Sequence, residues 1–364
     1  MDMDITFCTF YFDIDRQNWK SFNIPNNTYL YWFQNVLSLN INLHIETEEK
    51  FAERIIEYRR KFDPLLKKTI LKIRQVEELP AYKLYNKQLE NLMFSDEFKK
   101  KVHHNVPEMT KPLYNVLMFN KLYSLKQVIE ENPFNTKFFS WIDVGFIRDE
   151  KWIINNHNWP DPNKLKLNEN KILFFNINNN ILKDLQYSDL SQKEFHCMSQ
   201  CRYLKGTIFF LDGLVIDDLI FKFDKNVRFC LDNKFIGSDE KIFDLCYLDD
   251  PTAFDLVQCD WREEFYLYAK ANEVSYNLTL SWNAGDIQES NCGYDFLYIG
   301  VEDSTTKVIH RCDLNPIDHS DVFLGKTCHI NVSFKSPTKP NRYIVWPVDA
   351  NKRWLNRLEF PVNN

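Results

Sequence analysis

The segment "TKFFSWIDVGFIRDE", from Thr136 to Glu150, constrains the fold more than any other part of the sequence. Its nearly continuous apolar run is typical of a strand buried on both faces of a parallel sheet. The run ends in a single acidic residue, Asp143, and Gly145 follows two positions later. A carboxylate at the tip of a buried strand is costly unless something offsets its charge. Asp143 is therefore either a functional residue or the cap of the following turn.

Strand-like and helix-like segments alternate along roughly the first 265 residues. Residues 5–14, "ITFCTFYFDI", are rich in β-branched and aromatic residues and predict a first strand. Further strands are expected at "INLHIET", "TILKIRQV", "KILFFNI" and "GTIFFLDGLVIDDL". This alternation predicts an α/β fold in which a mostly parallel sheet is flanked by helices, with right-handed crossovers.

The clearest predicted helix is "TKPLYNVLMFNKLYSLKQVIEEN", which we expect Thr110 to cap and which has Pro112 in its first turn. Its apolar residues form one arc at helical spacing, and Lys121 falls near the middle of that arc. A lysine on an apolar face must either extend to the rim or meet a negative partner. Either a diphosphate or a strand-end carboxylate could be that negative partner.

The sequence pattern changes after Trp261, where short β-like runs are separated by Gly, Asn, Asp and Pro. The pattern predicts two domains, an α/β domain over residues 1–265 and a smaller, sandwich-like all-β module over residues 270–364. The module is rich in aromatic residues, which either form its core or stack on sugar rings. They are Trp282, Tyr294, Tyr298, Trp346 and Trp354.

Charge and targeting signals exclude several classes of protein. A formal net charge of −6 with mixed signs gives no general reason to expect a nucleic-acid partner. The acidic N-terminus does not resemble a secretory signal, and no apolar run approaches the roughly 20 residues of a membrane-spanning helix. The nine cysteines form no CxxC pair, which favours a reducing compartment. We expect a cytoplasmic protein without a transmembrane segment.

Three groups of acidic residues could carry chemistry. In open α/β sheets ligands bind beyond the carboxyl ends of the strands, so Asp13 and Asp143 could face one crevice. Two carboxylates there would suit Mn²⁺ or Mg²⁺. In "KFIGSDEKIFDL", Asp239 and Glu240 would open a helix, where the helix dipole alone favours acids. The functional alternative is a general base for an acceptor hydroxyl.

Four segments together resemble the HtrL/YibB (WlaTC) family over residues 5–265. They are "TFCTFYFDIDRQNW", "PEMTKPLYNVLMFNKLYSL", "FFSWIDVGF" and "GSDEKIF…DWREEF", and the Trp-Ile-Asp-x-Gly element is the most specific part. That family is similar to GT-A glycosyltransferases, whose strand-end Asp-x-Asp binds a divalent metal and a sugar-nucleotide diphosphate. Asp143 matches the first Asp of such a motif, whereas Gly145 stands in place of the second.

The resemblance implies a hexosyltransferase-like enzyme that transfers a sugar from a nucleotide-diphosphate donor to a hydroxyl of a glycan or protein. It implies Asp143 as a ligand of Mn²⁺ or Mg²⁺, and Asp239 or Glu240 on the acceptor side. Residues expected to contact the donor are Asp13, Arg16, Lys121, Trp141 and Gly145, of which Lys121 is our inference for the phosphates. The alternative is a catalytically inactive carbohydrate-binding or assembly protein on the same scaffold, and the β module lies outside the resemblance.

Overall fold

The structure is a computed structural model of the 364-residue chain. It describes residues 5–102, 106–154, 156–177, 189–199, 203–259 and 264–269, together with the backbone of strands in residues 274–361. The chain forms two compact units, Met1–Lys270 and Ala271–Asn364. Each unit is described by itself.

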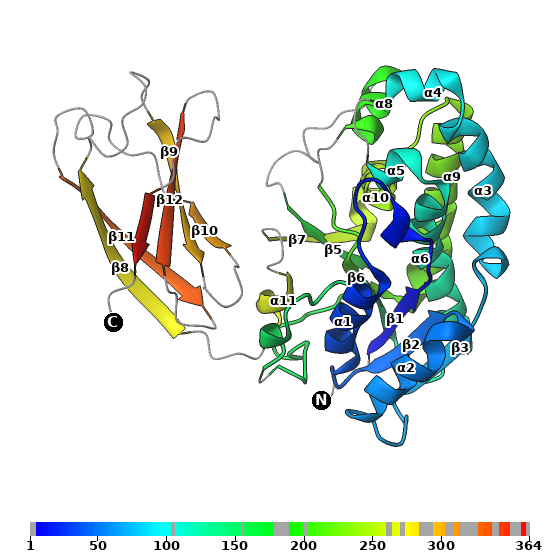
Figure 1. Ribbon diagram of the computed structural model, residues 1–364, viewed down its shortest axis with the longest axis horizontal. Helices are drawn as coiled ribbons and strands as arrows, with labels where there is room; N and C mark the ends of the chain where they lie inside the picture. The colour runs from blue at the N-terminus through cyan, green and yellow to red at the C-terminus, as the bar shows by residue number, and fades with distance from the viewer. Residues whose placement is uncertain are drawn as a thin grey trace. The chain divides into compact units, whose positions relative to one another are not determined.

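The first unit is built on a seven-stranded sheet with the strand order β3-β2-β1-β4-β6-β5-β7 (Figure 1). All neighbouring strands pair in parallel except β6, which is antiparallel to both β4 and β5. The prediction of a mostly parallel sheet is therefore confirmed. The strands are β1 (Ile5–Tyr11), β2 (Asn42–Thr47), β3 (Thr69–Ile73), β4 (Phe138–Ile142), β5 (Ile172–Asn176), β6 (Ile208–Asp212) and β7 (Phe254–Gln258).

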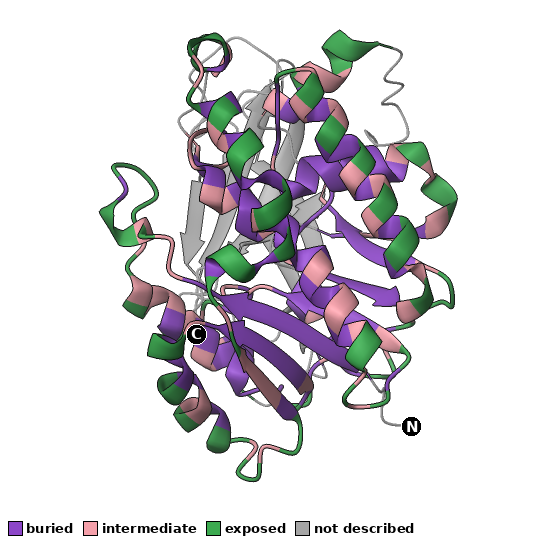
Figure 2. Cartoon of the chain, turned by 90° about the vertical axis from the view of Figure 1, so that its right-hand side faces the viewer, coloured by how far each residue is buried: buried purple, intermediate pink, exposed green. Residues whose placement is uncertain are grey.

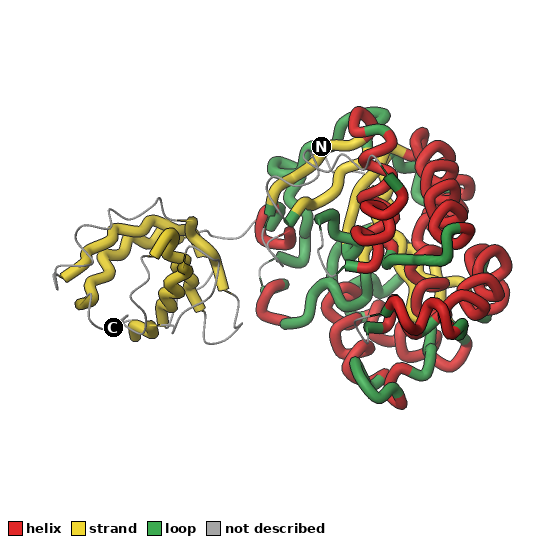
Figure 3. Tube along the Cα trace, turned by 90° about the horizontal axis from the view of Figure 1, so that it is seen from above, coloured by secondary structure: helices red, strands yellow, loops and turns green. Residues whose placement is uncertain are grey.

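Helices cover both faces of this sheet, as Figure 3 shows from above. The described α-helices are α1 (Asn26–Leu37), α2 (Glu49–Arg60), α3 (Pro80–Met93), α4 (Asp96–Lys101), α5 (Pro107–Thr110), α6 (Pro112–Glu131), α8 (Leu190–Met198), α9 (Ile216–Asp232), α10 (Asp239–Asp249) and α11 (Glu264–Leu267). Short 3₁₀ turns are η1 (Arg16–Asn18), η2 (Val76–Glu78), η3 (Glu150–Trp152), η4 (Gly213–Val215) and η5 (Pro251–Ala253).

The main core lies between the sheet and the layer formed by α3, α6, α9 and α10. Alternate side chains of the strands enter it, as expected when successive residues point to opposite faces. Examples are Phe10 of β1, Trp141 of β4 and Phe209 of β6, which are all buried. Figure 2 shows the buried strands and the exposed outer sides of the helices. This packing fixes α6, and therefore Lys121, directly against β1 and β4.

Two local predictions are wrong. Thr110 does not cap α6, because it ends the separate helix α5 and its hydroxyl donates to the Val106 carbonyl; Lys111 takes the cap position. The run "GTIFFLDGLVIDDL" is a strand only as far as Asp212, after which η4 leads into α9. In α9 the apolar residues recur at helical spacing, and Asp217 and Asp218 occupy the favourable first turn.

The described residues of the second unit form β-strands. A four-stranded sheet has the order β10-β9-β12-β13, β11 pairs with β8, and all of these pairs are antiparallel. The strands are β8 (Val274–Asn283), β9 (Tyr294–Glu302), β10 (Ile309–Asp313), β11 (Thr327–Ser336), β12 (Arg342–Asp349) and β13 (Leu358–Pro361). The side chains proposed to stack on sugars, and Trp354 as a whole, lie outside the described residues.

Among the described helices, none combines the length and the apolar character that a membrane span requires.

Candidate active site

The candidate site lies at the carboxyl ends of β1 and β4. Because β6 runs antiparallel to β4, the start of β6 reaches this same edge. The Asp143 backbone N–H donates to the Thr207 carbonyl over 2.8 Å, which places Gly206 and Thr207 beside the end of β4. Segments far apart in the sequence are thus joined at one edge of the sheet, where ligands of open α/β sheets bind.

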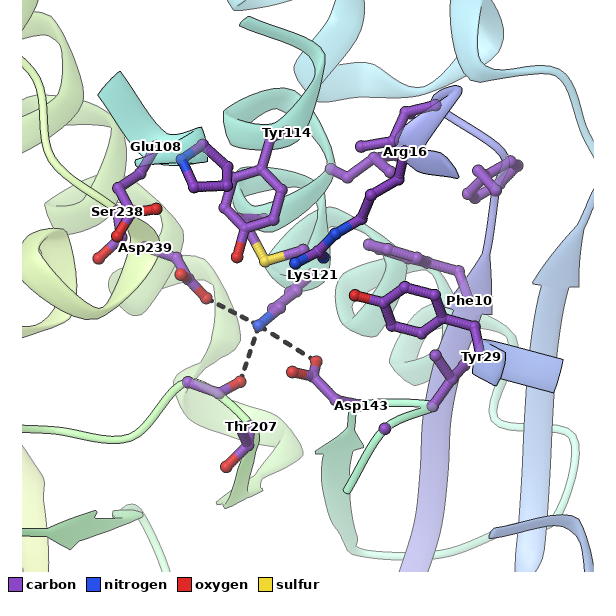
Figure 4. A pocket seen from close by; sticks show the side chains of 18 of the residues that line it. Phe10, Arg16, Tyr29, Glu108, Tyr114, Lys121, Asp143, Thr207, Ser238 and Asp239 are labelled. Atoms are coloured by element: carbon purple, nitrogen blue, oxygen red, sulfur yellow. Dashed lines mark hydrogen bonds and ion pairs between the residues drawn. The ribbon is translucent and has the colours of Figure 1, made fainter. Parts of the chain in front are cut away.

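A pocket of about 300 Å³ opens at this edge. Its volume is at the lower end of the range found for small-molecule sites. Figure 4 shows the side chains that enter it from the loop after β1, from α1, from α6 and from the start of α10. Of the eight residues predicted for the site, seven line it, namely Arg16, Lys121, Trp141, Asp143, Gly145, Asp239 and Glu240.

Lys121 forms the centre of the charged network. Its Nζ lies 2.8 Å from Asp239 Oδ2 and 3.2 Å from Asp143 Oδ1, and it donates to the Gly206 carbonyl over 2.8 Å (Figure 4). The lysine is 1% exposed, so the sequence argument that it needs a negative partner is correct, and the partners are protein carboxylates.

The charges of Lys121 and Asp143 depend on each other. Burial opposes the charged form of Lys121, but Asp143 and Asp239 outweigh it and raise the pKa of the ammonium above its ordinary value. Burial raises the pKa of Asp143, whereas Lys121 and the Trp141 indole act to lower it. The net effect is a raised pKa for Asp143, and the Lys121 ammonium is the largest influence that acts against this rise.

The first turn of α10 supplies Asp239 and Glu240, both buried. Glu240 Oε1 accepts from the Gly206 N–H over 3.3 Å, while Asp239 is held by Lys121. Gly206 permits this close approach, since a Cβ there would lie 2.6 Å from Asp239 Oδ2 and 3.2 Å from Glu240 Cγ. The glycine before β6 thus has a steric reason that the sequence alone did not reveal.

Trp141 lies behind the charged network and is 1% exposed. Its indole Nε1 donates to Asp143 Oδ1 over 2.6 Å, and the Lys121 Nζ lies 5.6 Å from the ring centroid. Its ring also packs against Phe10, with 4.7 Å between centroids. These contacts make Trp141 a positioning residue for Asp143, and a direct contact with a donor stays a prediction.

Asp13 belongs to the loop after β1 rather than to the lining of this pocket. Its Oδ1 accepts from the Asp15 N–H over 2.9 Å, and its Oδ2 accepts from Asn26 Nδ2 over 2.8 Å and Lys50 Nζ over 3.1 Å. Both carboxylate oxygens are therefore used to order the loop that carries Arg16. The predicted donor contact of Asp13 would have to compete with these bonds.

Two arginines supply positive charge at the pocket. The Arg16 Cζ lies 5.4 Å, 5.2 Å and 5.7 Å from the ring centroids of Trp19, Tyr29 and Tyr114. Arg148 contacts the Trp32 ring at 4.6 Å, and its Nε donates to the Gly145 carbonyl. Stacking on aromatic faces holds each guanidinium in place beside the pocket.

Sequence reasoning missed several lining residues because they come from turns or from helix faces without a motif. Arg148 had a usable signal, since a cation five residues after a strand-end acid lies in the same loop. The missed residues include Tyr29, Glu108, Tyr114, Arg148, Gly206 and Thr207.

The residues around Asp143 do not fit the expected divalent metal. A hard cation needs several oxygen ligands with lone pairs directed at one point. Here the Lys121 ammonium already occupies the point shared by Asp143, Asp239 and the Gly206 carbonyl. Within the described ranges, no group of three His, Cys, Asp or Glu side chains is arranged to hold a metal ion.

The fold and the pocket define the first unit as a mostly parallel α/β protein with a charged, ligand-sized cleft at its strand ends. The chain belongs to the HtrL_YibB family, described as a bacterial protein of unknown function, whose model matches residues 3–270. The resemblance seen in the sequence is therefore confirmed. No match was found among curated proteins.

Two solved structures similar to this chain are glycosyltransferases. One is the galactosyltransferase LgtC in complex with donor and acceptor sugar analogs, with a TM-score of 0.37 and 10% identity, covering 69% of this chain and 73% of that one. The other is the glycosyltransferase GlyE of Streptococcus pneumoniae TIGR4, with a TM-score of 0.30 and 8% identity, covering 70% of this chain and 45% of that one.

Proposed function

We propose that the protein is a glycosyltransferase that moves a sugar, of hexose type, from a nucleotide-diphosphate donor to a hydroxyl of a glycan or protein. The observation that carries this proposal is the joining of Arg16, Asp143 and Asp239 in one pocket at the carboxyl ends of β1 and β4. The sequence resemblance to a family that is itself similar to GT-A glycosyltransferases supports it.

The pocket offers charge for both halves of such a reaction. A nucleoside diphosphate leaves as an anion when the bond between its oxygen and the anomeric carbon breaks, and Arg16 and Arg148 are suited to bind that anion. Guanidinium groups bind phosphate oxygens through paired N–H donors, which also fixes orientation. In this proposal the two arginines take the donor-phosphate role that sequence reasoning gave to Lys121.

The acceptor side requires a base. An acceptor hydroxyl forms the new bond to the anomeric carbon, and its proton passes to Asp239 or Glu240 at the start of α10. Both carboxylates line the pocket, and each has an oxygen held by the protein, Asp239 by Lys121 and Glu240 by the Gly206 N–H. Such fixed carboxylates cost little reorganisation during proton transfer.

The proposal is tested by screening the full chain against UDP- and GDP-hexoses. Binding to the folded state raises the midpoint of thermal unfolding, so a shift identifies the donor class. Release of the nucleoside diphosphate is then followed with a panel of glycan acceptors. We expect Arg16→Ala to weaken donor binding by about 10- to 100-fold, because a charge-assisted contact is lost.

A matched control is Lys87→Ala. Lys87 lies on α3, its side chain is 81% exposed, and it pairs with Glu90 across 3.9 Å. This variant should bind and turn over the donor like the wild type. If Arg16→Ala and Lys87→Ala behave alike, the pocket does not bind the donor.

The second candidate is a protein that binds a nucleotide sugar or glycan without transferring it. It is favoured by the engagement of Asp143 and Asp239 with Lys121, which could leave the pocket without a catalytic carboxylate. Saturable donor binding that Arg16→Ala weakens, with no product formed from any acceptor, would support this function over transfer.

A further inference from the structure

The Lys121 ammonium has no N–H to spare for a ligand. An ammonium carries three N–H donors, and three protein oxygens lie within reach of Nζ. They are the Gly206 carbonyl at 2.8 Å, Asp239 Oδ2 at 2.8 Å and Asp143 Oδ1 at 3.2 Å. Lys121 therefore lines the pocket with its ammonium bound to the two carboxylates and to the Gly206 carbonyl just before β6.

The same three oxygens would make a reasonable cation site if the lysine were absent. Carboxylate and carbonyl oxygens are the ligands that Mn²⁺ and Mg²⁺ accept, and water completes their shells. The Asp143 side chain keeps 27% of its surface exposed, whereas the side chains of Lys121 and Asp239 keep 2% and 5%. Water could therefore approach this point from the Asp143 side.

Steric evidence shows that the arrangement is built closely around the ammonium. The Gly206 backbone approaches Asp239 so closely that any Cβ would overlap its carboxylate. Trp141 fixes Asp143 Oδ1 from the other side through a 2.6 Å hydrogen bond. Both carboxylates are thus oriented toward one cationic point by residues that do not themselves carry charge.

We propose that Lys121 permanently takes the place of a divalent cation between Asp143 and Asp239, so that this pocket binds a diphosphate ligand without metal. The claim that the ligand is a diphosphate rests on the proposed function. The claim that Lys121 replaces a divalent cation rests on the geometry alone. In this proposal the positive charge for the ligand comes from Arg16 and Arg148, which both line the pocket.

The test measures Mn²⁺ binding to the full chain by electron paramagnetic resonance, with Mn²⁺ alone and no nucleotide present. Wild type and Asp143→Asn are expected to bind Mn²⁺ equally, because in both proteins the Lys121 ammonium occupies the position that a metal ion would take. Lys121→Ala removes the ammonium and should gain one saturable site, with binding at least about tenfold tighter than in the wild type. The double variant Lys121→Ala/Asp143→Asn should lose that site again.

Two results would overturn the inference. One is Mn²⁺ binding by the wild type that Asp143→Asn abolishes. The other is a folded Lys121→Ala variant that gains no site. If Lys121→Ala fails to fold, the comparison of wild type with Asp143→Asn still decides, because Asp143→Asn leaves the Lys121–Asp239 pair in place.

These outcomes are independent of catalysis. The Mn²⁺ measurement contains no donor sugar, so its results would be the same even if the protein had no transferase activity. A failure of the proposed function would instead appear as no thermal shift with any nucleotide sugar. Once a nucleoside diphosphate is found to bind in the absence of added metal, EDTA should not weaken that binding.

Discussion

At the residue scale, the burial of Lys121 between two carboxylates predicts a large cost for removing its charge. Lys121→Met keeps the side-chain length but leaves Asp239 without its cation in a site that is 3% exposed. Breaking a buried ion pair by removing one partner costs about 3–5 kcal/mol of unfolding free energy. Urea denaturation of the full chain measures this loss.

The control for this substitution lies on the same helix. Lys126 is 34% exposed at its side chain and pairs at the surface with Glu130 and Asp217, so Lys126→Met should cost less than about 1 kcal/mol. Adding Asp239→Asn to Lys121→Met should recover part of the loss, because it removes the unpaired charge. Equal costs for the two lysine substitutions would contradict the burial argument.

Two glycines at the pocket are expected to differ in how much an added methyl group destabilises the protein. In Gly206→Ala the new Cβ would lie 2.6 Å from Asp239 Oδ2, so α10 or β6 must shift, at a cost of about 1–3 kcal/mol. In Gly145→Ala it would meet the Trp32 ring at 3.4 Å, an ordinary contact. We expect Gly145→Ala to change the unfolding free energy by less than about 0.5 kcal/mol. Thermal and urea unfolding of both variants check this difference.

Single residues with an obvious electrostatic problem could be found from the sequence. Asp143 at the end of an apolar run and Lys121 on an apolar helix face each required a partner, and each proved to be a partner of the other. Gly206 could not be found in this way, because its importance depends on which segment the sheet brings alongside β4.

At the element scale, the direction of β6 is the feature that sequence reasoning could not supply. An apolar run is the same read in either direction, so nothing in "TIFFLD" shows that this strand runs antiparallel to β4. The consequence is functional, since only the antiparallel direction brings Gly206 and Thr207 to Asp143. The continuation into α9 was missed because a short apolar run does not separate strand from helix.

The buried strand β2 predicts a specific sensitivity to acid. His44 is fully buried, and burial together with Lys72 lowers its pKa from 6.5 to about 4. Neither ring nitrogen has a hydrogen-bond partner among the described residues. The folded state therefore resists protonation, whereas the unfolded chain takes up a proton near pH 6.5.

The stabilising contribution of neutral His44 is present above pH 6.5 and is lost as the pH falls toward 4. A pKa difference of this size corresponds to about 3 kcal/mol of unfolding free energy between pH 7 and pH 4. His44→Leu should remove that part of the pH dependence. Urea titrations of both proteins at several pH values measure it, and parallel pH curves would contradict the assignment.

At the scale of the whole molecule, the sequence was sufficient for the class of fold. Alternating strand and helix patterns predicted the mostly parallel sheet, and the change in texture after Trp261 predicted a β-rich second part. The compact units divide at Lys270, and the family model matches residues 3–270. Strand order and the composition of the pocket depend on contacts between distant segments, which no local pattern encodes.

The division at Lys270 predicts that a chain ending there folds by itself. The main core cluster is complete within this range, since all of its members lie between Cys8 and Phe254. We expect a chain of residues 1–270 to unfold cooperatively, with a midpoint within about 3 °C of the corresponding transition of the full chain. Calorimetry of both chains measures this.

The same comparison shows what the second unit contributes. The lining residues of the pocket all precede residue 241, so the shortened chain should bind a nucleoside diphosphate as tightly as the full chain does. If donor binding is kept while transfer to a glycan acceptor is lost, the residues after Lys270 act in acceptor recognition. If the shortened chain folds but has lost donor binding, the pocket described here does not bind the donor by itself, and the proposal that Arg16 and Arg148 suffice for the donor phosphates must be abandoned.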